Sequence, residues 1–284
     1  MKRYFILNAD DFGMSKANNL AVLEGYNEGL LKSASLVANG DDFDDAVNSI
    51  IPQCPELGVG VHLNIIEGKS LCSDTNTLTD ENGNFNNSFL KLLIKSYNPY
   101  EKEFLSEVER EFRVQIEKIM SKTKVSHIDS HVHVHSIPKI FDIVCRLAKE
   151  YGINQVRTQF EHPYIVPDVQ KNFNIKYFIN LVKVLLLNFF TLFNESTVQD
   201  YGLKTNDYII GVSYTSMMDA LAISYGIGVI KYEKATVEAL IHPCRYEDGI
   251  VDNHFEEFMI TKNKMLKEKI ESLGFEITNY VEKD

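Results

Sequence analysis

The sequence predicts an α/β fold, a closed or nearly closed (β/α) barrel that forms a single domain over residues 1–284. Short strand-like segments alternate with helix-like ones, as in folds where helices join parallel strands. A length of 284 residues is common for one barrel domain. Most polar residues of interest directly follow a predicted strand, and the strand ends of a barrel converge on one face. An open doubly wound sheet is the alternative, but it would spread these ends along a line.

The elements of the first half are predicted from short apolar runs and polar breaks. Residues 4–7 are apolar and predict a buried strand, after which Ser15 can cap a helix that reaches about residue 31. Residues 67–100 are rich in Asn, Ser, Thr and Asp, which predicts a long loop over one end of the fold. Two further strands are expected between them, at residues 35–38 and 58–63.

The second half repeats the alternation around one interruption. Apolar residues recur every three or four positions from 105 to 119, which predicts an amphipathic helix before a strand that starts near residue 125. Residues 160–206 lack the alternation and predict a partly helical insertion. The remaining elements are a helix from Pro138 to about Gly152, strands at residues 153–157, 208–213, 236–241 and 275–277, and a final helix carrying Phe255, Phe258, Met259, Leu266 and Ile270.

Composition narrows the class of protein. Hydrophobic residues make up 44% of the chain, enough for a full core. The net charge of -11 disfavours nucleic acid or an anionic membrane as a partner. The most apolar run, residues 182–193, contains Lys183 and Asn188 and is shorter than the ~20 residues of a membrane span. We therefore expect a buried helix, a lid or a subunit interface there, and no membrane partner.

Two features predict a cytoplasmic protein. Lys2 and Arg3 precede only four apolar residues, which is too short for the apolar region of a signal peptide. The four cysteines show neither metal-knuckle nor redox-motif spacing, so we expect separate reduced thiols.

Asp10 and Asp11 follow the first strand, and histidines that can share a cation with them come later in the chain. Buried carboxylates without a partner are costly, so they usually pair, bind metal or shift their pKa. A catalytic divalent site needs about three protein ligands and an open position, which Asp and His side chains can supply. Because adjacent strand residues point to opposite faces, we expect one Asp to be a ligand and the other a general base.

The candidate histidines are His62 and those of the run at residues 127–135. In an extended chain the alternating His and Asp side chains of the run would share one face. At ~3.3 Å per residue a single ion cannot reach them all, so one or two should bind and the others should support them or be exposed. The alternating residues are His127, Asp129, His131, His133 and His135.

Three motifs together resemble those of the YdjC-like carbohydrate deacetylases, which include the chitooligosaccharide deacetylases. They are Asn8-Ala9-Asp10-Asp11-Phe12-Gly13, His62-Leu63-Asn64, and the His-Ile-Asp-Ser-His-Val-His-Val-His run at 127–135. The resemblance extends from the first strand to about Arg157 and resumes at His242-Pro243. It implies a distorted, TIM-barrel-like (β/α) barrel, a divalent metal, a homodimer, and removal of acetyl groups from N-acetylated sugars.

The same resemblance implies roles for individual residues. The metal ligands would be Asp11, His62 and His131, with Asp10 as general base. His242 matches a later histidine that serves as general acid, and Arg157 a basic residue that orients Asp10 or the substrate. The resemblance implies Mg²⁺ as the cofactor, whereas two imidazoles and one carboxylate favour Zn²⁺ or another transition metal.

The expected function is therefore metal-dependent hydrolysis of the N-acetyl group of an acetamido sugar or short chitooligosaccharide, with that small sugar as the partner. One alternative is a metal-dependent phosphoesterase, which would usually need more carboxylate ligands for two metals. Another is a catalytically silent sugar- or metal-binding barrel. Paired-carboxylate glycosidase chemistry would leave the histidines without a role.

Overall fold

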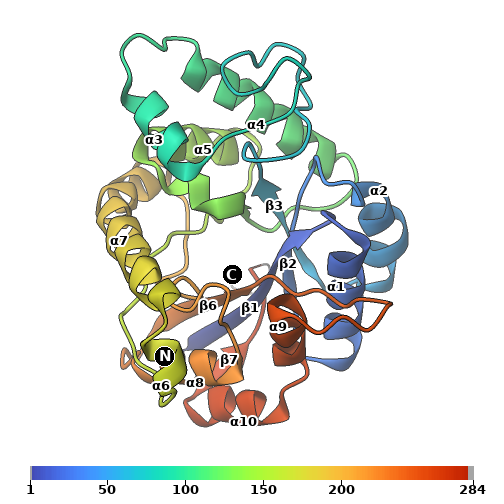
Figure 1. Ribbon diagram of the computed structural model, residues 1–284, viewed down its shortest axis with the longest axis vertical. Helices are drawn as coiled ribbons and strands as arrows, with labels where there is room; N and C mark the ends of the chain where they lie inside the picture. Colours follow the sequence, from blue (N-terminus) through green and yellow to red (C-terminus); the bar gives the residue numbers. More distant parts are fainter. Residues whose placement is uncertain (1, 281–284) are drawn as a thin grey trace.

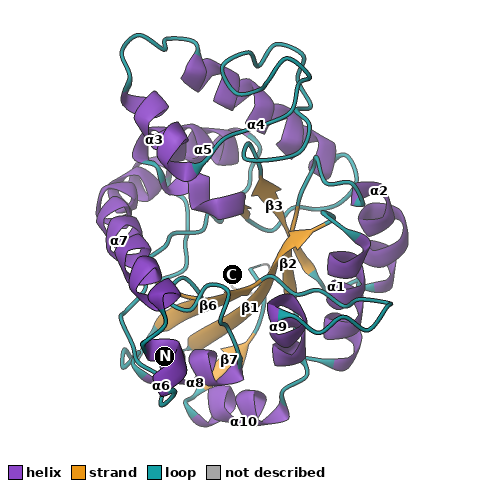
Figure 2. Ribbon diagram, in the orientation of Figure 1, coloured by secondary structure: helices purple, strands orange, loops and turns teal. Residues whose placement is uncertain are grey.

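The computed structural model describes residues 2–280 and contains one seven-stranded parallel sheet. The strands follow the order β4-β3-β2-β1-β6-β5, and β7 pairs with β1 off this path. The sheet curls into a half-barrel with helices around it, which confirms the predicted α/β barrel in its distorted form (Figure 1, Figure 2). The strands are β1 (Arg3–Phe12), β2 (Ser33–Leu36), β3 (Gly58–Leu63), β4 (Ile128–Ser130), β5 (Tyr208–Ile210), β6 (Ala235–Ile241) and β7 (Phe275–Ile277).

The central strand β1 carries the first candidate site residues. Along one edge it pairs with β6 from Arg3 to Ala9. Its other partners are β7, opposite residues 3–5, and β2, opposite residues 8–12, with an irregular register between Ala9 and Phe12. The irregularity therefore falls at the two adjacent aspartates. The predicted strand at 275–277 is confirmed as β7, which pairs with the first part of β1.

Isolated backbone contacts link the two edge strands, β4 and β5, where the strand at 153–157 was predicted. Single parallel bridges join Ile128 to Val156 and Gln155 to Lys204, and the Ile209 amide donates to the Phe160 carbonyl at 2.9 Å. The predicted strand is thus wrong as a regular element, because its residues pair one at a time with two different neighbours. The segment still carries Arg157 to the inside of the barrel, where its side chain is fully buried.

Most helices occur where the sequence predicts them, but several begin or end at other residues than expected. Ser15 caps α1 as predicted, with its side chain accepting from the Asn18 amide. The predicted final helix is two helices, because Asn263 caps a new one. Residues within the predicted loop at 67–100 form α3, which Ser88 caps. The helices are α1 (Lys16–Glu28), α2 (Phe43–Asp45), α3 (Phe89–Tyr97), α4 (Phe104–Met120), α5 (Pro138–Glu150), α6 (Val169–Asn172), α7 (Ile175–Tyr201), α8 (Ala220–Gly228), α9 (Asn253–Thr261) and α10 (Lys264–Ser272), with short helical turns η1 (Ala46–Ile50), η2 (Ile51–Gln53) and η3 (His131–Ser136).

The predicted insertion at 160–206 contains the longest helix, α7, of 27 residues. An 18-residue window of α7 has a mean hydropathy of 1.6, so this helix is long and apolar enough to cross a membrane by length and composition alone. The apolar run at 182–193 therefore belongs to a longer helix than the run itself indicates. Only 33% of the window is buried, and Figure 1 shows α7 on the outside of the half-barrel.

Candidate metal-binding and catalytic site

Asp10 and Asp11 lie where β1 leaves the regular sheet. Asp11 has a φ of 65°, a left-handed conformation that is uncommon for a residue with a side chain. The strict alternation of strand side chains therefore breaks at this position. Oxygens of both carboxylates lie within 4.8 Å of a His62 ring nitrogen, so the two aspartates approach the same histidine.

Asp11, His62 and His131 come together from three distant stretches of the chain. Asp11 Oδ1 lies 2.8 Å from His131 Nδ1 and 3.3 Å from His62 Nε2. One ligand atom from each residue lies within 4.8 Å of the other two. His62 Nε2 is buried and has no hydrogen-bond partner among the described residues. The three atoms are one carboxylate oxygen and two imidazole nitrogens, and one of these nitrogens is buried without a hydrogen bond to any described residue. Such a set fits a divalent cation.

Asp129 orients His62 from the other side of the ring. Its Oδ1 lies 2.6 Å from His62 Nδ1, and the Ser35 hydroxyl donates to its Oδ2 at 2.6 Å. A carboxylate on the second nitrogen of a metal-binding histidine fixes its tautomer and ring direction. The sequence left the role of Asp129 open, and the structure gives it this position behind His62.

Arg157 lies at the centre of a buried ionic network. Its guanidinium donates to both carboxylate oxygens of Asp10, at 2.7 and 2.8 Å, and lies 2.6 Å from Asp129 Oδ2. It also donates to Glu238 Oε1 at 2.5 and 3.0 Å. Sequence reasoning missed Glu238, although a charged residue within the apolar run of β6 was a signal. Burial alone would lower the pKa of Arg157, but Asp10, Asp129 and Glu238 raise it well above its usual value.

The electrostatics of the cluster favour bound positive charge. Burial would raise the pKa of Asp11, but the hydrogen bond to His131 and the nearby ring of His62 hold that pKa well below its usual value. Burial would lower the pKa of His62, yet Asp129 and Asp10 raise it to about 10. A cation held by Asp11 and His62 can take the place of the proton that these carboxylates stabilise.

His242 follows β6 and faces the same region. Its Nδ1 lies 3.5 Å from Glu257 Oε2, on α9, and its backbone amide donates to the same oxygen at 2.5 Å. Burial would lower the pKa of His242, but Glu257 and the nearby aspartates raise it to about 9. The imidazole is therefore protonated at neutral pH and can donate a proton.

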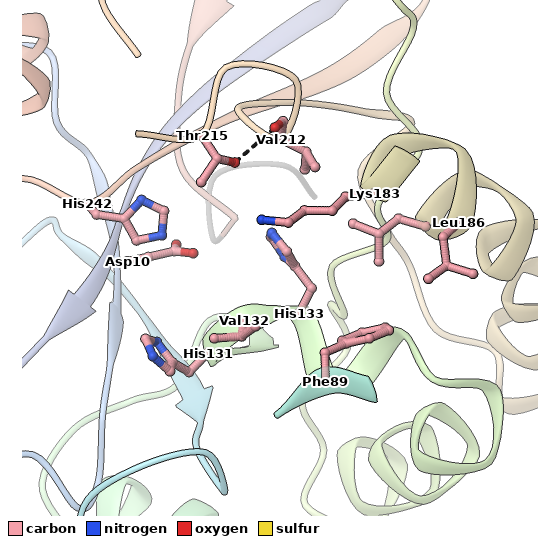
Figure 3. Close-up of a pocket in the computed structure, with 11 residues that line it drawn as sticks. Asp10, Phe89, His131, Val132, His133, Lys183, Leu186, Val212, Thr215 and His242 are labelled. Carbon is pink, nitrogen blue, oxygen red and sulfur yellow. Dashed lines mark hydrogen bonds between the residues drawn. The ribbon is translucent and has the colours of Figure 1, made fainter. Parts of the chain in front are cut away.

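A pocket of about 230 Å³ connects these groups (Figure 3). Asp10, His131 and His242 lie at one side of it, and apolar residues of α3 and α7 form the opposite wall. The cavity can therefore place a small molecule against the candidate ligands and proton donors. Its lining residues are Asp10, Phe89, His131, Val132, His133, Lys183, Leu186, Leu187, Val212, Thr215 and His242.

The run at 127–135 is not extended, which corrects the expectation of one shared face. β4 ends at Ser130, and η3 places Val132 and His133 at φ values of 53° and 58°. His131 alone of these histidines joins the metal cluster, while His133 turns into the pocket, and its buried Nδ1 has no hydrogen-bond partner among residues 2–280. His127 and His135 are buried and bonded to Ser126 and Ser130 respectively.

One further acidic residue near the cluster had no sequence signal. Glu67 Oε1 lies 3.3 Å from His131 Nε2, so the two ring nitrogens of His131 face two different carboxylates. Glu67 lies in the predicted loop after β3 and is exposed. Glu67 and His131 are far apart in the sequence, so no local sequence pattern predicts their contact.

Comparison of the sequence with known proteins finds relatives named carbohydrate deacetylases. A carbohydrate deacetylase of Clostridium beijerinckii is 41% identical over 149 residues, which cover 52% of this chain and 57% of the relative. A carbohydrate deacetylase of Geobacillus stearothermophilus is 37% identical over 171 residues, or 60% of this chain and 66% of the relative. The chain thus matches little more than half the length of the first of these relatives.

Solved structures with the same fold cover the whole chain. A protein of Enterococcus faecalis V583, to which cellobiose-phosphate cleavage has been attributed, superposes with a TM-score of 0.75 over 99% of both chains at 22% identity. An uncharacterised protein of Agrobacterium tumefaciens C58 gives a TM-score of 0.51 at 8% identity, covering 98% of this chain and 87% of that one. At these identities the likeness shows a shared fold.

The sequence profile of the YdjC-like proteins matches residues 4–272, which include β1 except its first residue, every later element up to α10, and the cluster of Asp11, His62 and His131. The chain therefore belongs to the YdjC-like protein family.

Proposed function

We propose that the chain is a metal-dependent hydrolase that removes the N-acetyl group from an acetamido sugar or short chitooligosaccharide. The observation that carries this proposal is the cluster of Asp11, His62 and His131 beside a pocket that Asp10 and His242 also line. The relatives named carbohydrate deacetylases support the same class of substrate and reaction.

The proposed ligands of the cation are Asp11 Oδ1, His62 Nε2 and one ring nitrogen of His131. A bound divalent cation supplies Lewis acidity, lowering the pKa of water and polarising an amide carbonyl. Two imidazoles and one carboxylate favour Zn²⁺ over Mg²⁺, because Mg²⁺ prefers shells made of oxygen ligands. The carboxylate of Asp129 supports this set by fixing the ring of His62.

Asp10 is the proposed general base. Burial would raise its pKa, but Arg157 lowers it below its usual value, so the side chain is a carboxylate at neutral pH. Hydrogen bonds from Asn8 and Arg157 occupy three of the roughly four acceptor positions of a carboxylate. The remaining position is available to take a proton from a water molecule in the pocket during attack on the amide carbon.

His242 is the proposed general acid. The protonated ring lines the same pocket as Asp10 and can donate to the departing amine of the sugar. Glu257 holds the histidine through both its backbone amide and its Nδ1, which leaves Nε2 as the nitrogen available for donation. Base and acid therefore come from β1 and the end of β6, two strands paired along the sheet.

The decisive experiment measures acetate release from N,N'-diacetylchitobiose and related N-acetyl sugars. The protein is first treated with a chelator, and single divalent metals are then returned. Acetate release that disappears with chelation and returns with a metal supports the proposal. Absence of release with every metal and sugar, together with retained sugar binding, would instead support a silent binding protein.

Phosphate release from phosphate esters, measured in parallel, tests the phosphoesterase alternative. A two-metal site would need a second cation near Asp10 and Asp129, which do form a group with His62. The guanidinium of Arg157 lies 2.6 to 2.8 Å from both of these carboxylates and already supplies their positive charge. A second metal there would face electrostatic repulsion, so the structure favours single-metal chemistry.

A further inference from the structure

One side of α7 exposes a continuous row of large apolar side chains. They recur with a strict seven-residue spacing, so they share one face over three heptads. Their exposed fractions range from 36% to 70%, although such side chains are usually buried. We call these residues the apolar face: Ile175, Phe178, Ile179, Val182, Leu185, Leu186, Phe189, Leu192 and Phe193.

Two neighbouring helices extend the apolar face. At its start, Val169 and Phe173, in and just after α6, are 70% and 78% exposed. Helix α3 lies against α7 through the stacked rings of Phe89 and Phe190, 6.4 Å apart, and Figure 1 shows the two helices on the same flank. α3 adds the exposed side chains of Leu90, Ile94 and Tyr97.

The charge of this region is opposite to that of the whole chain. The protein has 40 Asp and Glu residues and a net charge of -11, yet residues 169–194 contain Lys171, Lys176 and Lys183 and no acidic residue. The two later lysines are exposed and have no ion-pair partner among residues 2–280. α3 adds the exposed Lys91, while its other lysine, Lys95, pairs with Glu101 at 3.5 Å, as Lys171 pairs with Asp219. The face is thus apolar with basic flanks.

The apolar face is also continuous with the candidate active site. Phe89 of α3 and Leu186 and Lys183 of α7 line the pocket that contains Asp10 and His242 (Figure 3). Leu186 is at the same time part of the exposed row. Whatever covers the apolar face therefore lies at the mouth of the pocket.

We propose that the apolar face binds an anionic lipid surface and holds the pocket mouth against it. Large apolar side chains flanked by lysines are typical of helices that lie in the plane of a membrane interface. The other side of α7 packs on the protein through residues such as Val184, Leu187 and Phe190, so the helix lies on the membrane rather than across it. The net charge of -11 led us to expect no membrane partner. That value sums over the whole chain and does not show that residues 169–194 contain lysines and no acidic residue.

Charge also favours a lipid surface over a second copy of the chain. Two copies meeting through this face would bring their exposed Lys176 side chains together, and residues 169–194 of either copy contain no acidic side chain to compensate them. Anionic headgroups would neutralise exposed lysines such as Lys176 while the acyl region takes up the phenylalanines and leucines, whereas the amine of Lys183 points into the pocket (Figure 3). The proposal concerns binding and does not depend on the reaction proposed above.

The test is co-sedimentation of the full-length protein with vesicles of phosphatidylcholine and with vesicles of equal parts phosphatidylcholine and phosphatidylglycerol. We expect binding to the anionic vesicles that weakens as salt is added. The triple variant Phe178→Gln, Leu185→Gln, Leu192→Gln should lower the partition coefficient roughly tenfold or more, because it removes exposed apolar surface. Lys176→Glu should weaken binding to anionic vesicles more than to neutral ones.

A matched control triple, Ile250→Gln, Val251→Gln, Met265→Gln, removes exposed apolar residues from the loop before α9 and from α10, outside the apolar face, and should bind as the unaltered protein does. Circular dichroism establishes that both triples are folded. Absence of binding to either vesicle would overturn the proposal. If sedimentation velocity then shows a dimer that only the α7 triple dissociates, the face is a subunit interface. Equal loss of vesicle binding in both triples would likewise reject a role for α7.

Discussion

Arg157 holds the carboxylate of Asp10 with two parallel hydrogen bonds, from Nη1 to Oδ2 at 2.8 Å and from Nη2 to Oδ1 at 2.7 Å. Both side chains are almost completely buried. The planar fork of an arginine fixes the plane of the carboxylate as well as its charge. Because Arg157 comes from the irregular segment between β4 and β5, the closure of the barrel and the orientation of Asp10 depend on each other.

Replacing Asp10 should separate catalysis from metal binding. We predict that Asp10→Asn lowers the rate of acetate release by roughly 10²–10⁴, the usual contribution of a general base, because an amide cannot take the proton. The ligand set of Asp11, His62 and His131 remains intact, so the metal content should not change. Acetate release and elemental analysis of the purified variant give the two readings. Undiminished turnover would refute the role of Asp10.

Removing Arg157 should destabilise the whole barrel. Arg157→Met leaves the carboxylates of Asp10, Asp129 and Glu238 buried without their cation, and breaking a buried ion pair in this way costs roughly 3–5 kcal/mol of unfolding free energy. Urea unfolding at neutral pH measures the loss. If Arg157→Met does not fold, Arg157→Lys, which keeps the charge but loses the fork, should fold with an intermediate stability. A loss below about 1 kcal/mol in the Met variant would contradict the importance of this network.

The metal cluster can be tested without any substrate. Divalent cations added after chelation should raise the melting temperature of the protein, since a ligand at 100 times its Kd stabilises by about 2.7 kcal/mol. We predict that His62→Gln and His131→Gln abolish this rise. His133→Gln is the matched control, because His133 lines the pocket but does not join the cluster. A rise that persists in His62→Gln and His131→Gln would mean that the cation binds elsewhere, and a rise lost in His133→Gln as well would contradict the three-residue ligand set.

Local sequence patterns predicted the parts of the fold whose contacts are regular. β3 occupies residues 58–63 as expected, because an apolar run between turn residues fits a strand with neighbours on both sides. The stripe at 105–119 predicts α4 to within a residue at each end, since an amphipathic face determines a helix that packs on a sheet. The segment at 153–157, predicted as a strand, has only isolated partners, which the sequence does not show.

The site was predictable in its residue types and less so in its geometry. The proximity of Asp11, His62 and His131 follows from three strand ends that meet on one face, as parallel barrel strands do. The left-handed conformation of Val132 is disfavoured by its β-branched side chain, so only the surrounding structure enforces the turn that separates His131 from His133. Glu238 is 81 positions from Arg157, and no local pattern connects them.

Glu161, a buried carboxyl group that is hydrogen-bonded to the residues on either side of Val212, should make stability depend on pH. Its side chain accepts hydrogen bonds from the amides of Gly211 and Ser213, at 2.9 and 2.8 Å, and its own amide donates to Asn188 of α7 at 2.9 Å. Glu161 thus joins α7 to the loop that carries Val212. Burial raises the pKa of this carboxyl to about 7, against the opposing effect of the hydrogen bonds.

A carboxyl group with a raised pKa binds a proton in the folded state over a pH range in which the unfolded chain, with a pKa of about 4.3, has lost it. The free energy of unfolding therefore falls as pH rises between these two values and levels off above about 7. Gln at position 161 cannot titrate. We predict that the stability of the unaltered protein relative to Glu161→Gln decreases by about 3 kcal/mol between pH 5 and pH 8, measured by urea unfolding of both proteins. A difference that stays constant or increases with pH would show that Glu161 is already ionised in the folded protein at pH 5, held so by the amides of Gly211 and Ser213.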